Sequence, residues 1–271
     1  MAPPRRVRQA LNRAPPSLTQ PGASRRGVRV RRTPADDALS KCGAAKRQRS
    51  GDPRHRNEWR MAMKLYGFGP TRSLRALWGL RELGADFEFV PVNLLAGEHR
   101  SPEFLALNPA GKVPVLVDGD SVITESAAIV LYLAEKYPER GLLPTDVKER
   151  AQVYRWVLFA MTELEQPLWR MAKHTVLLPE NKRLPQDIAL AGEDFAAMAR
   201  VLERHMDGRQ FIVGDRITAA DCVTAYLMDW ANENHLIDGF PNLRAYLDRM
   251  YARSAAPQRI AEAFASIQTA A

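Results

Sequence analysis

The chain has 271 residues, which is enough for one or two domains with a sizeable buried core. Its formal net charge of +8 would suit a nucleic-acid partner, but residues 1–60 hold 14 Arg and 2 Lys against four acidic residues, and the remainder is net negative. Two distant cysteines, five scattered histidines and no apolar run of about 20 residues argue against a disulfide framework, a metal site and a membrane span. We therefore expect a cytoplasmic protein whose folded part binds neither nucleic acid nor membrane.

Residues 1–60 are rich in Arg, Pro, Ala and Ser and show little apolar periodicity. Such a segment cannot bury enough surface to offset the entropy of ordering, so we expect a disordered basic extension. Its Arg-rich, acid-poor composition fits an organelle transit peptide, and it also fits a nucleic-acid-binding arm. Met61 and Met63 directly precede the first predicted strand, which favours a dispensable or non-native extension.

The next segment, residues 61–138, alternates between strand and helix patterns. Period-2 and helical apolar spacing predict a short α/β unit. The expected elements are a strand at 63–68, a helix at 71–83, a strand at 87–92, a short helix at 101–107, a hairpin of 113–118 and 121–124, and a helix at 125–137. The order βαβαββα predicts a small sheet covered by helices.

From 146 to 271 every segment has helical spacing. Residues 154–168 predict one long helix, and further helices are expected at 188–206, 217–234, 242–253 and 257–267. Thr218 and Asp221, three residues apart, predict a capping box at the start of the third of these helices. We expect an all-α domain in which this box has a structural role.

Pro114 lies directly before a strand pattern, where it removes a backbone donor. The preceding Val113 must be extended. A cis Val113–Pro114 bond would turn the Val113 backbone outward, where it could pair with an extended peptide. An edge-strand proline without functional meaning is the alternative.

Glu125 and Ser126 open an apolar helix. A helix N-terminus and a serine hydroxyl suit a carboxylate, and a glutamate there can accept from an ammonium group. Together they would fit the α-amino-acid end of a ligand. An ordinary helix cap with a favourably placed glutamate is the alternative.

The stretch "GEHRSPEFLALNPAGKVPVLVDGDSVITESAAIVLYLAEKYP" resembles the glutathione-binding half of the soluble glutathione transferases, and "FIVGDRITAADC" resembles their helical half. The resemblance covers roughly residues 63–265 and is closest to bacterial, theta- or delta-like members. It implies a thioredoxin-like α/β N-terminal domain, an all-α C-terminal domain, a homodimer, and glutathione as co-substrate with no metal. The implied activity is conjugation of the glutathione thiolate to small apolar electrophiles, as in detoxification.

The resemblance also assigns ligand roles to individual residues. Glu125 and Ser126 would hold the γ-glutamyl end of glutathione, and Val113, before a cis Pro114, would pair with the cysteinyl backbone. Lys112 and His99 would meet the glycine carboxylate. For His99 an exposed loop position without a ligand is the alternative.

The sequence offers more than one candidate for the group that stabilises the thiolate. In the family a Tyr, Ser or Cys near the first strand or helix has this role, and one alignment of "GFGPTRSLR" places Phe68, which cannot do so, at that position. The other alignments favour Thr71, then Ser73, with Tyr66 third; both hydroxyls could instead only cap the helix. One hydrogen bond to a charged acceptor contributes about 1.5–3 kcal/mol, enough to lower a thiol pKa by one to two units.

The electrophile would lie between the domains, beside aromatic side chains of the long helix that could equally belong to the core. These are Tyr154, Trp156, Phe159 and Trp169. Arg72 and Arg75 could add positive potential, although charged residues on a helix are more often solvated. A non-catalytic interaction module that still binds glutathione is the competing function, whereas cysteine-based reduction is disfavoured because no Cys lies near the first helix.

Overall fold

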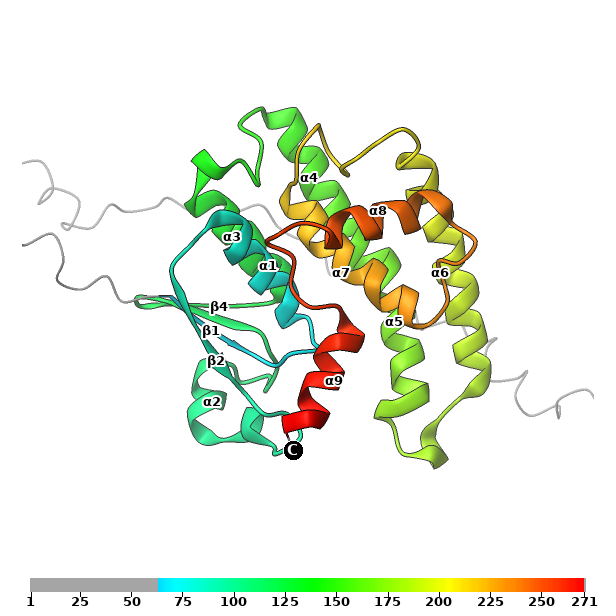
Figure 1. Ribbon diagram of the computed structural model, residues 1–271. Coiled ribbons are helices and arrows are strands. Elements are labelled where there is room, and N and C mark those ends of the chain that lie inside the picture. The colour runs from blue at the N-terminus through cyan, green and yellow to red at the C-terminus, as the bar shows by residue number, and fades with distance from the viewer. Residues whose placement is uncertain (1–62, 271) are drawn as a thin grey trace, which may run out of the picture. The chain divides into compact units, whose positions relative to one another are not determined.

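The computed structural model describes residues 63–270, with side chains up to residue 266. The predicted basic extension, residues 1–60, lies outside this part of the chain. The described residues begin with a four-stranded sheet and continue as a helical half (Figure 1). Both halves have the architecture expected from the sequence.

The sheet has the strand order β2-β1-β3-β4. β1 (Met63–Gly67) pairs in parallel with β2 (Phe87–Pro91) and antiparallel with β3 (Val115–Asp118), which forms a hairpin with β4 (Ser121–Thr124). The hairpin turns at Gly119, whose φ of 63° is favourable only without a side chain. This mixed sheet is the thioredoxin-like arrangement.

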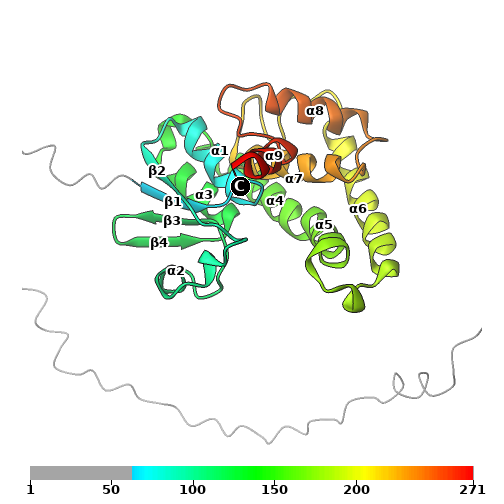
Figure 2. The same cartoon turned by 60° about the horizontal axis from the view of Figure 1, so that its bottom comes forward.

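Helices cover both faces of the sheet. α1 (Ser73–Leu83) and α3 (Ser126–Lys136) lie on one face, and the short α2 (Pro102–Leu107) lies on the other, as two views show (Figures 1 and 2). Leu65 and Leu116 of the two central strands are fully buried in the main core. The apolar periodicity of the two long helices thus places their buried faces against the sheet.

The second half of the described chain is helical. Its longer elements are α4 (Val147–Phe159), α5 (Glu165–Ala172), α6 (Pro185–His205), α7 (Ala219–Glu233), α8 (Pro241–Tyr251) and α9 (Ile260–Ala270). α7 is buried along nearly its whole length and packs against α1, α3, α4 and α8. It therefore forms the centre of the helical half and joins that half to the sheet unit.

One predicted helix differs from the structure. The segment predicted as a single long helix at 154–168 is α4 followed by a π-helical turn, η5 (Ala160–Leu164), and then α5; a second π-helical turn, η6 (Lys173–Leu177), follows. Each π turn shifts the buried face of the helix, because it adds one residue per turn. Glu165 and Leu168, which follow η5, are both buried.

The capping box at the start of α7 is confirmed. Asp221 Oδ2 accepts hydrogen bonds from the Thr218 backbone N–H at 2.8 Å and from the Thr218 hydroxyl at 2.9 Å. Asp221 Oδ1 accepts from the Ile212 N–H and from the Tyr246 hydroxyl. Burial raises the pKa of the Asp221 carboxyl to about 6, even though these donors favour its charged form.

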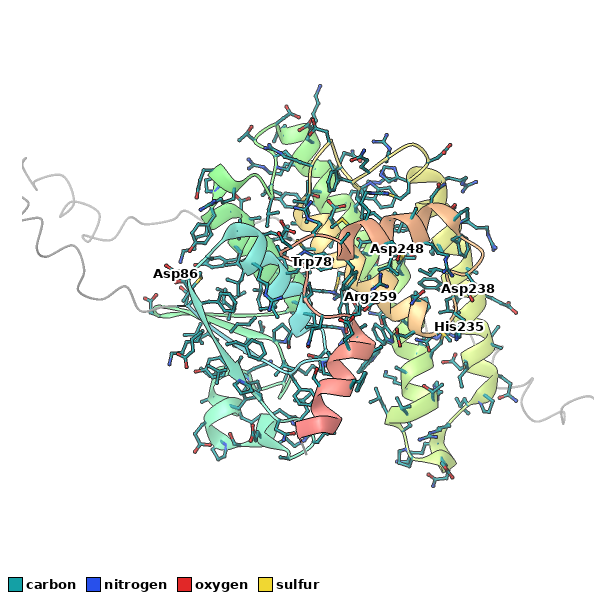
Figure 3. All side chains as sticks on the ribbon, in the orientation of Figure 1. Trp78, Asp86, His235, Asp238, Asp248 and Arg259 are labelled. Carbon is teal, nitrogen blue, oxygen red and sulfur yellow. The ribbon has the colours of Figure 1, made fainter. Side chains whose placement is uncertain are left out.

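The last helix is anchored by buried charge. Asp229 of α7 is fully buried and accepts a hydrogen bond from the Ile260 N–H at the start of α9, at 2.8 Å. Arg259 contacts Asp229 and also Asp248 of α8, and the labelled Arg259 and Asp248 side chains show this position (Figure 3). α9 thus begins where α7 and α8 meet.

No helix of residues 63–270 is long and apolar enough to cross a membrane.

Candidate functional site

A cavity of about 310 Å³ lies where the sheet unit meets the helical half. Its walls combine the loop before α1, the turn before β3, the start of α3, and the segment from η5 to α5. The lining residues are Arg72, Asn108, Lys112, Val113, Pro114, Glu125, Ser126, Met161, Glu165, Gln166 and Trp169. The cavity thus brings together five of the six predicted glutathione-binding residues.

The turn before β3 has a fixed shape. The Val113–Pro114 peptide bond is cis. Asn108, which is buried, donates to the Lys112 carbonyl at 2.7 Å and accepts from the Ala110 N–H at 3.1 Å. Asn108 was not predicted as a site residue, although the "NPAGK" sequence contains it. Val113 has no strand partner in the described sheet, so its backbone remains available beside the cavity.

Glu125 and Ser126 occupy the start of α3. Glu125 has φ 66°, a left-handed conformation that is uncommon for a residue with a side chain and is often found at functional sites. Its side chain is exposed, whereas Ser126 is 2% exposed and still lines the cavity. The arrangement presents one carboxylate, one hydroxyl and the free N–H groups of a helix N-terminus to the same space.

Two arginines of the first helix region share one carboxylate. Glu165 of α5, 2% exposed, contacts Arg72 Nε through Oε1, and its Oε2 lies 2.8 Å from Arg75 Nη2. The expectation that Arg75 is solvated is wrong, because its side chain is fully buried in α1. Arg72 is partly exposed in the cavity wall, and its guanidinium lies over the Trp169 ring at 4.6 Å. These charges come from both halves of the protein.

The two predicted thiolate-stabilising hydroxyls lie in the turn that leads into α1, Thr71 before it and Ser73 as its first residue, and neither lines the cavity. The Thr71 hydroxyl donates to the Phe68 carbonyl at 2.7 Å and lies 2.9 Å from Ser73 Oγ, which accepts from the Phe68 N–H. Ser73 is 1% exposed, whereas Thr71 is partly exposed. α1 begins at Ser73 and not at Thr71, so both hydroxyls belong to the turn that enters the helix.

Gly67 explains why this loop lies so close to the sheet. A Cβ atom on Gly67 would lie 2.9 Å from the Ser73 Cβ and 2.9 Å from the Phe89 ring. Only glycine leaves room for the turn at this distance. Tyr66, the third predicted hydroxyl, lines a different hollow, which includes Phe104 and Leu107.

His99 also lies outside the cavity lining. It belongs to the 3-10 turn η3 (Glu98–Arg100), and its carbonyl oxygen would lie 3.1 Å from a Cβ on Gly111. Gly111 has φ 60°, so a side chain there would be both strained and crowded. His99 is therefore adjacent to the turn that carries Lys112. Its buried Nδ1 has no hydrogen-bond partner among the residues that the structure describes.

The aromatic residues considered for the electrophile wall separate into different environments. Trp169 lines the cavity. Trp156 is buried and lies 4.2 Å from the His205 ring, Phe159 contacts Trp156, and the Tyr154 hydroxyl donates to Glu135 at the surface. Three of the four aromatic residues thus have roles away from the cavity. No cluster of His, Cys, Asp or Glu within the described residues could hold a metal ion.

The protein thus combines a thioredoxin-like domain with a helical domain, and a polar cavity lies where the two meet. This combination defines its class. Residues 61–135 match the family model of the glutathione S-transferase N-terminal domain, and residues 185–249 match that of the C-terminal domain. The chain belongs to the glutathione S-transferase family.

The most similar of the compared proteins include members of this family from plants. Glutathione S-transferase F9 of Arabidopsis thaliana is 35% identical over 211 residues, which are 74% of this chain and 98% of that protein. A zeta-class glutathione S-transferase of Euphorbia esula is 40% identical over 163 residues, which are 59% of this chain and 71% of that protein. These plant relatives give no support to the bacterial, theta- or delta-like subclass that the sequence resemblance suggested.

The solved structures agree as well. Glutathione transferase F7 of Populus trichocarpa is 27% identical with a TM-score of 0.66, and the match covers 74% of this chain and 99% of that one. Glutathione S-transferase-I bound with lactoylglutathione is also 27% identical, with a TM-score of 0.64 and the same coverage.

Proposed function

We propose that this protein is a glutathione transferase that adds the glutathione thiolate to small apolar electrophiles. The observation that carries the proposal is the cavity that gathers Lys112, Val113, Pro114, Glu125 and Ser126 from two separate segments. Such a set has both donors and acceptors for a zwitterionic peptide. The named relatives, all of them glutathione S-transferases, support the same activity.

Each end of glutathione has a partner of suitable chemistry. The Glu125 carboxylate accepts from the γ-glutamyl ammonium, while Ser126 and the N–H groups at the start of α3 donate to the γ-glutamyl carboxylate. The Val113 backbone pairs with the cysteinyl residue as an added strand would. Lys112, with His99 beside the same turn, interacts with the glycine carboxylate.

In this arrangement the cysteinyl sulfur lies near the loop before α1. Thr71 is our first choice and Ser73 our second for the hydroxyl that donates to the thiolate, which requires the Thr71 proton to leave the Phe68 carbonyl. The thiolate then attacks the electrophilic carbon. A new S–C bond forms, and the electron pair of the broken bond leaves with the departing group or moves into the substrate.

The electrophile occupies the other side of the cavity. Met161, Gln166 and Trp169 come from η5 and α5 and form part of the cavity lining that the helical half contributes. A thioether and an indole face suit an apolar, flat substrate. We place the two functional domains at residues 61–138 and 146–271, with the cavity between them.

We also propose that the protein is a homodimer in the cytoplasm. Val147, Tyr154 and Leu158 of α4 are 73%, 36% and 61% exposed and lie on one side of the helix at spacings of seven and four. An exposed apolar stripe of this kind is typical of a surface that another molecule covers. A second copy of this chain is the partner that the family resemblance suggests.

A non-catalytic, glutathione-binding interaction module is the second candidate. One observation favours it: neither Thr71 nor Ser73 lines the cavity. Such a protein would bind glutathione without turnover.

Calorimetric titration with glutathione, together with a chloronitrobenzene conjugation assay, tests the proposal. We expect binding and turnover by the wild type, and at least tenfold weaker binding by Glu125→Ala. Glu139→Ala, an exposed glutamate outside the cavity, is the matched control and should bind as the wild type does. Lack of glutathione binding by the wild type would contradict both candidates, whereas binding without conjugation would select the module.

A further inference from the structure

The orientation of the Ser126 hydroxyl follows from its buried neighbour. Arg75 Nη1 lies 3.2 Å from Ser126 Oγ, and both side chains are buried. A guanidinium can only donate, so Ser126 Oγ must accept this bond. The hydroxyl proton is then left for another acceptor. Since Ser126 lines the cavity and no other partner of its hydroxyl occurs among the described residues, the proton is available to a ligand in the cavity.

Arg75 is held firmly by groups from the helical half. Its guanidinium lies 2.8 Å from Glu165 Oε2 and 3.3 Å from Met161 Sδ, and it faces the Tyr226 ring at 4.8 Å. Burial raises the pKa of the Tyr226 phenol to about 12, so this neighbour is neutral at physiological pH. Glu165 is thus the one anionic partner of Arg75 in the described chain.

Glu165 does not neutralise the cluster completely. It also contacts Arg72, so one carboxylate serves two arginines and one unit of positive charge is left over. Arg75 Nε is buried and has no hydrogen-bond partner in the part of the chain that the structure describes. An uncompensated buried cation is costly, and an anion in the adjoining cavity reduces that cost.

We propose that Arg75, held by Glu165, is a positioning residue that turns the Ser126 hydroxyl toward the γ-glutamyl carboxylate and adds positive charge beneath it. This inference rests on the proposed glutathione binding. The binding site then includes the buried Arg75–Glu165 pair, which does not contact the ligand, in addition to the residues that do. The pair also gives the helical half a part in recognising the γ-glutamyl end of the peptide.

A ligand comparison tests the inference. The two probes are glutathione and 4-aminobutyryl-cysteinyl-glycine, which is the same peptide without the γ-glutamyl α-carboxylate. The readout is the ratio of their dissociation constants, measured by calorimetry. We expect Arg75→Met to reduce the preference for glutathione about tenfold or more, because the variant loses both the oriented hydroxyl and the charge. Arg75→Lys, which keeps the charge, should recover part of the preference.

Ser126→Ala should reduce the same ratio in the wild type and change it less than about twofold in Arg75→Met. Arg81→Met is the matched control, because Arg81 is an exposed arginine of the same helix that donates to the Ala256 carbonyl and does not line the cavity. It should leave the ratio within about threefold of the wild type. If Arg75→Met does not fold, the double variant Arg75→Met/Glu165→Gln, which removes both buried charges, takes its place.

A purely structural role for Arg75 would weaken both probes equally and leave the ratio unchanged, and this result would overturn the inference. The proposed function fails in a different way, since wild-type protein would then bind neither probe. An unchanged ratio in a variant derived from a glutathione-binding wild type therefore rejects the positioning role alone.

Discussion

Arg253, just after α8, forms a two-pronged ion pair with Glu82 of α1, with nitrogen–oxygen distances of 2.7 and 2.8 Å. Glu82 Oε1 also accepts from Trp78 Nε1 at 3.1 Å. The Glu82 side chain is only 7% exposed, so this carboxylate depends on protein donors in place of water. The pair joins the segment between α8 and α9 to the first helix of the sheet unit.

Arg253→Ala should therefore lower the free energy of unfolding by about 2 kcal/mol, because Glu82 stays buried with only the Trp78 donor. Urea denaturation followed by circular dichroism measures the change. Arg140→Ala is the matched control: Arg140 and Glu139 are both exposed and 4.0 Å apart, so its loss should cost less than about 0.5 kcal/mol. Equal effects of the two variants would show that the buried pair adds no stability.

The capping carboxylate predicts a pH effect. Burial raises the pKa of Asp221 in the folded state to about 6, above its ordinary 3.8, so the folded protein holds this proton more tightly than the unfolded chain does. The stability that protonation contributes is complete below about pH 4 and is lost as pH rises through about 6. Asp221→Asn removes this contribution. The free energy of unfolding of the wild type, relative to that of the variant, should therefore fall as the pH rises from about 4 to about 6.

The same side chain can be tested at one pH. Asp221→Ala should cost about 3 kcal/mol at neutral pH, because the Ile212 and Thr218 N–H groups lose their acceptor inside the protein. Thermal and urea unfolding both measure the change. A cost below about 1 kcal/mol would show that water replaces the carboxylate at the start of α7.

The two loop hydroxyls should differ in their effects on catalysis and stability. Thr71→Val is expected to raise the pH midpoint of kcat/KM by about one unit, because the thiolate loses one hydrogen bond that favours its charged form. Ser73→Ala should mainly lower stability, because Ser73 is buried and its oxygen accepts from the Phe68 N–H. A midpoint that rises in Ser73→Ala and stays constant in Thr71→Val would reverse the assignment.

The apolar stripe on α4 predicts the oligomeric state. We expect sedimentation analysis to show a dimer for the wild type and a monomer for Leu158→Glu, since a charge at this position would be buried in the interface. Leu190→Glu is the matched control, because Leu190 is similarly exposed, on α6 and outside the stripe. A monomeric wild type would contradict the proposed homodimer.

The sequence predicted those parts of the fold that depend on local patterns. The strands, the hairpin at Gly119 and the Thr218–Asp221 box have signals within a few residues, and the structure has all of them. The turn at Val113–Pro114 and the polar start of α3 also have local signals, and the resemblance to the glutathione transferases predicted both as parts of the site. Both line the cavity.

The missed features depend on contacts between distant segments. Arg75 has the sequence context of a solvated helix residue, yet it is buried, and its anionic partner is Glu165, 90 positions later. Glu165 is itself turned inward after the π-helical turn η5, for which the apolar spacing gave no signal. No pattern within one helix could therefore have predicted the charge cluster beneath the cavity.

The shared carboxylate of Glu165 has a consequence for how such proteins can change. The sheet unit carries the residues proposed to contact glutathione, whereas the counter-ion of its buried Arg75 is Glu165 of the helical half. An exchange of the helical half for that of another family member would thus preserve the peptide site only if the new partner brings an acid to the position of Glu165. In the proposed site, the Glu165 side chain thus links recognition of the ligand to the packing of the two halves.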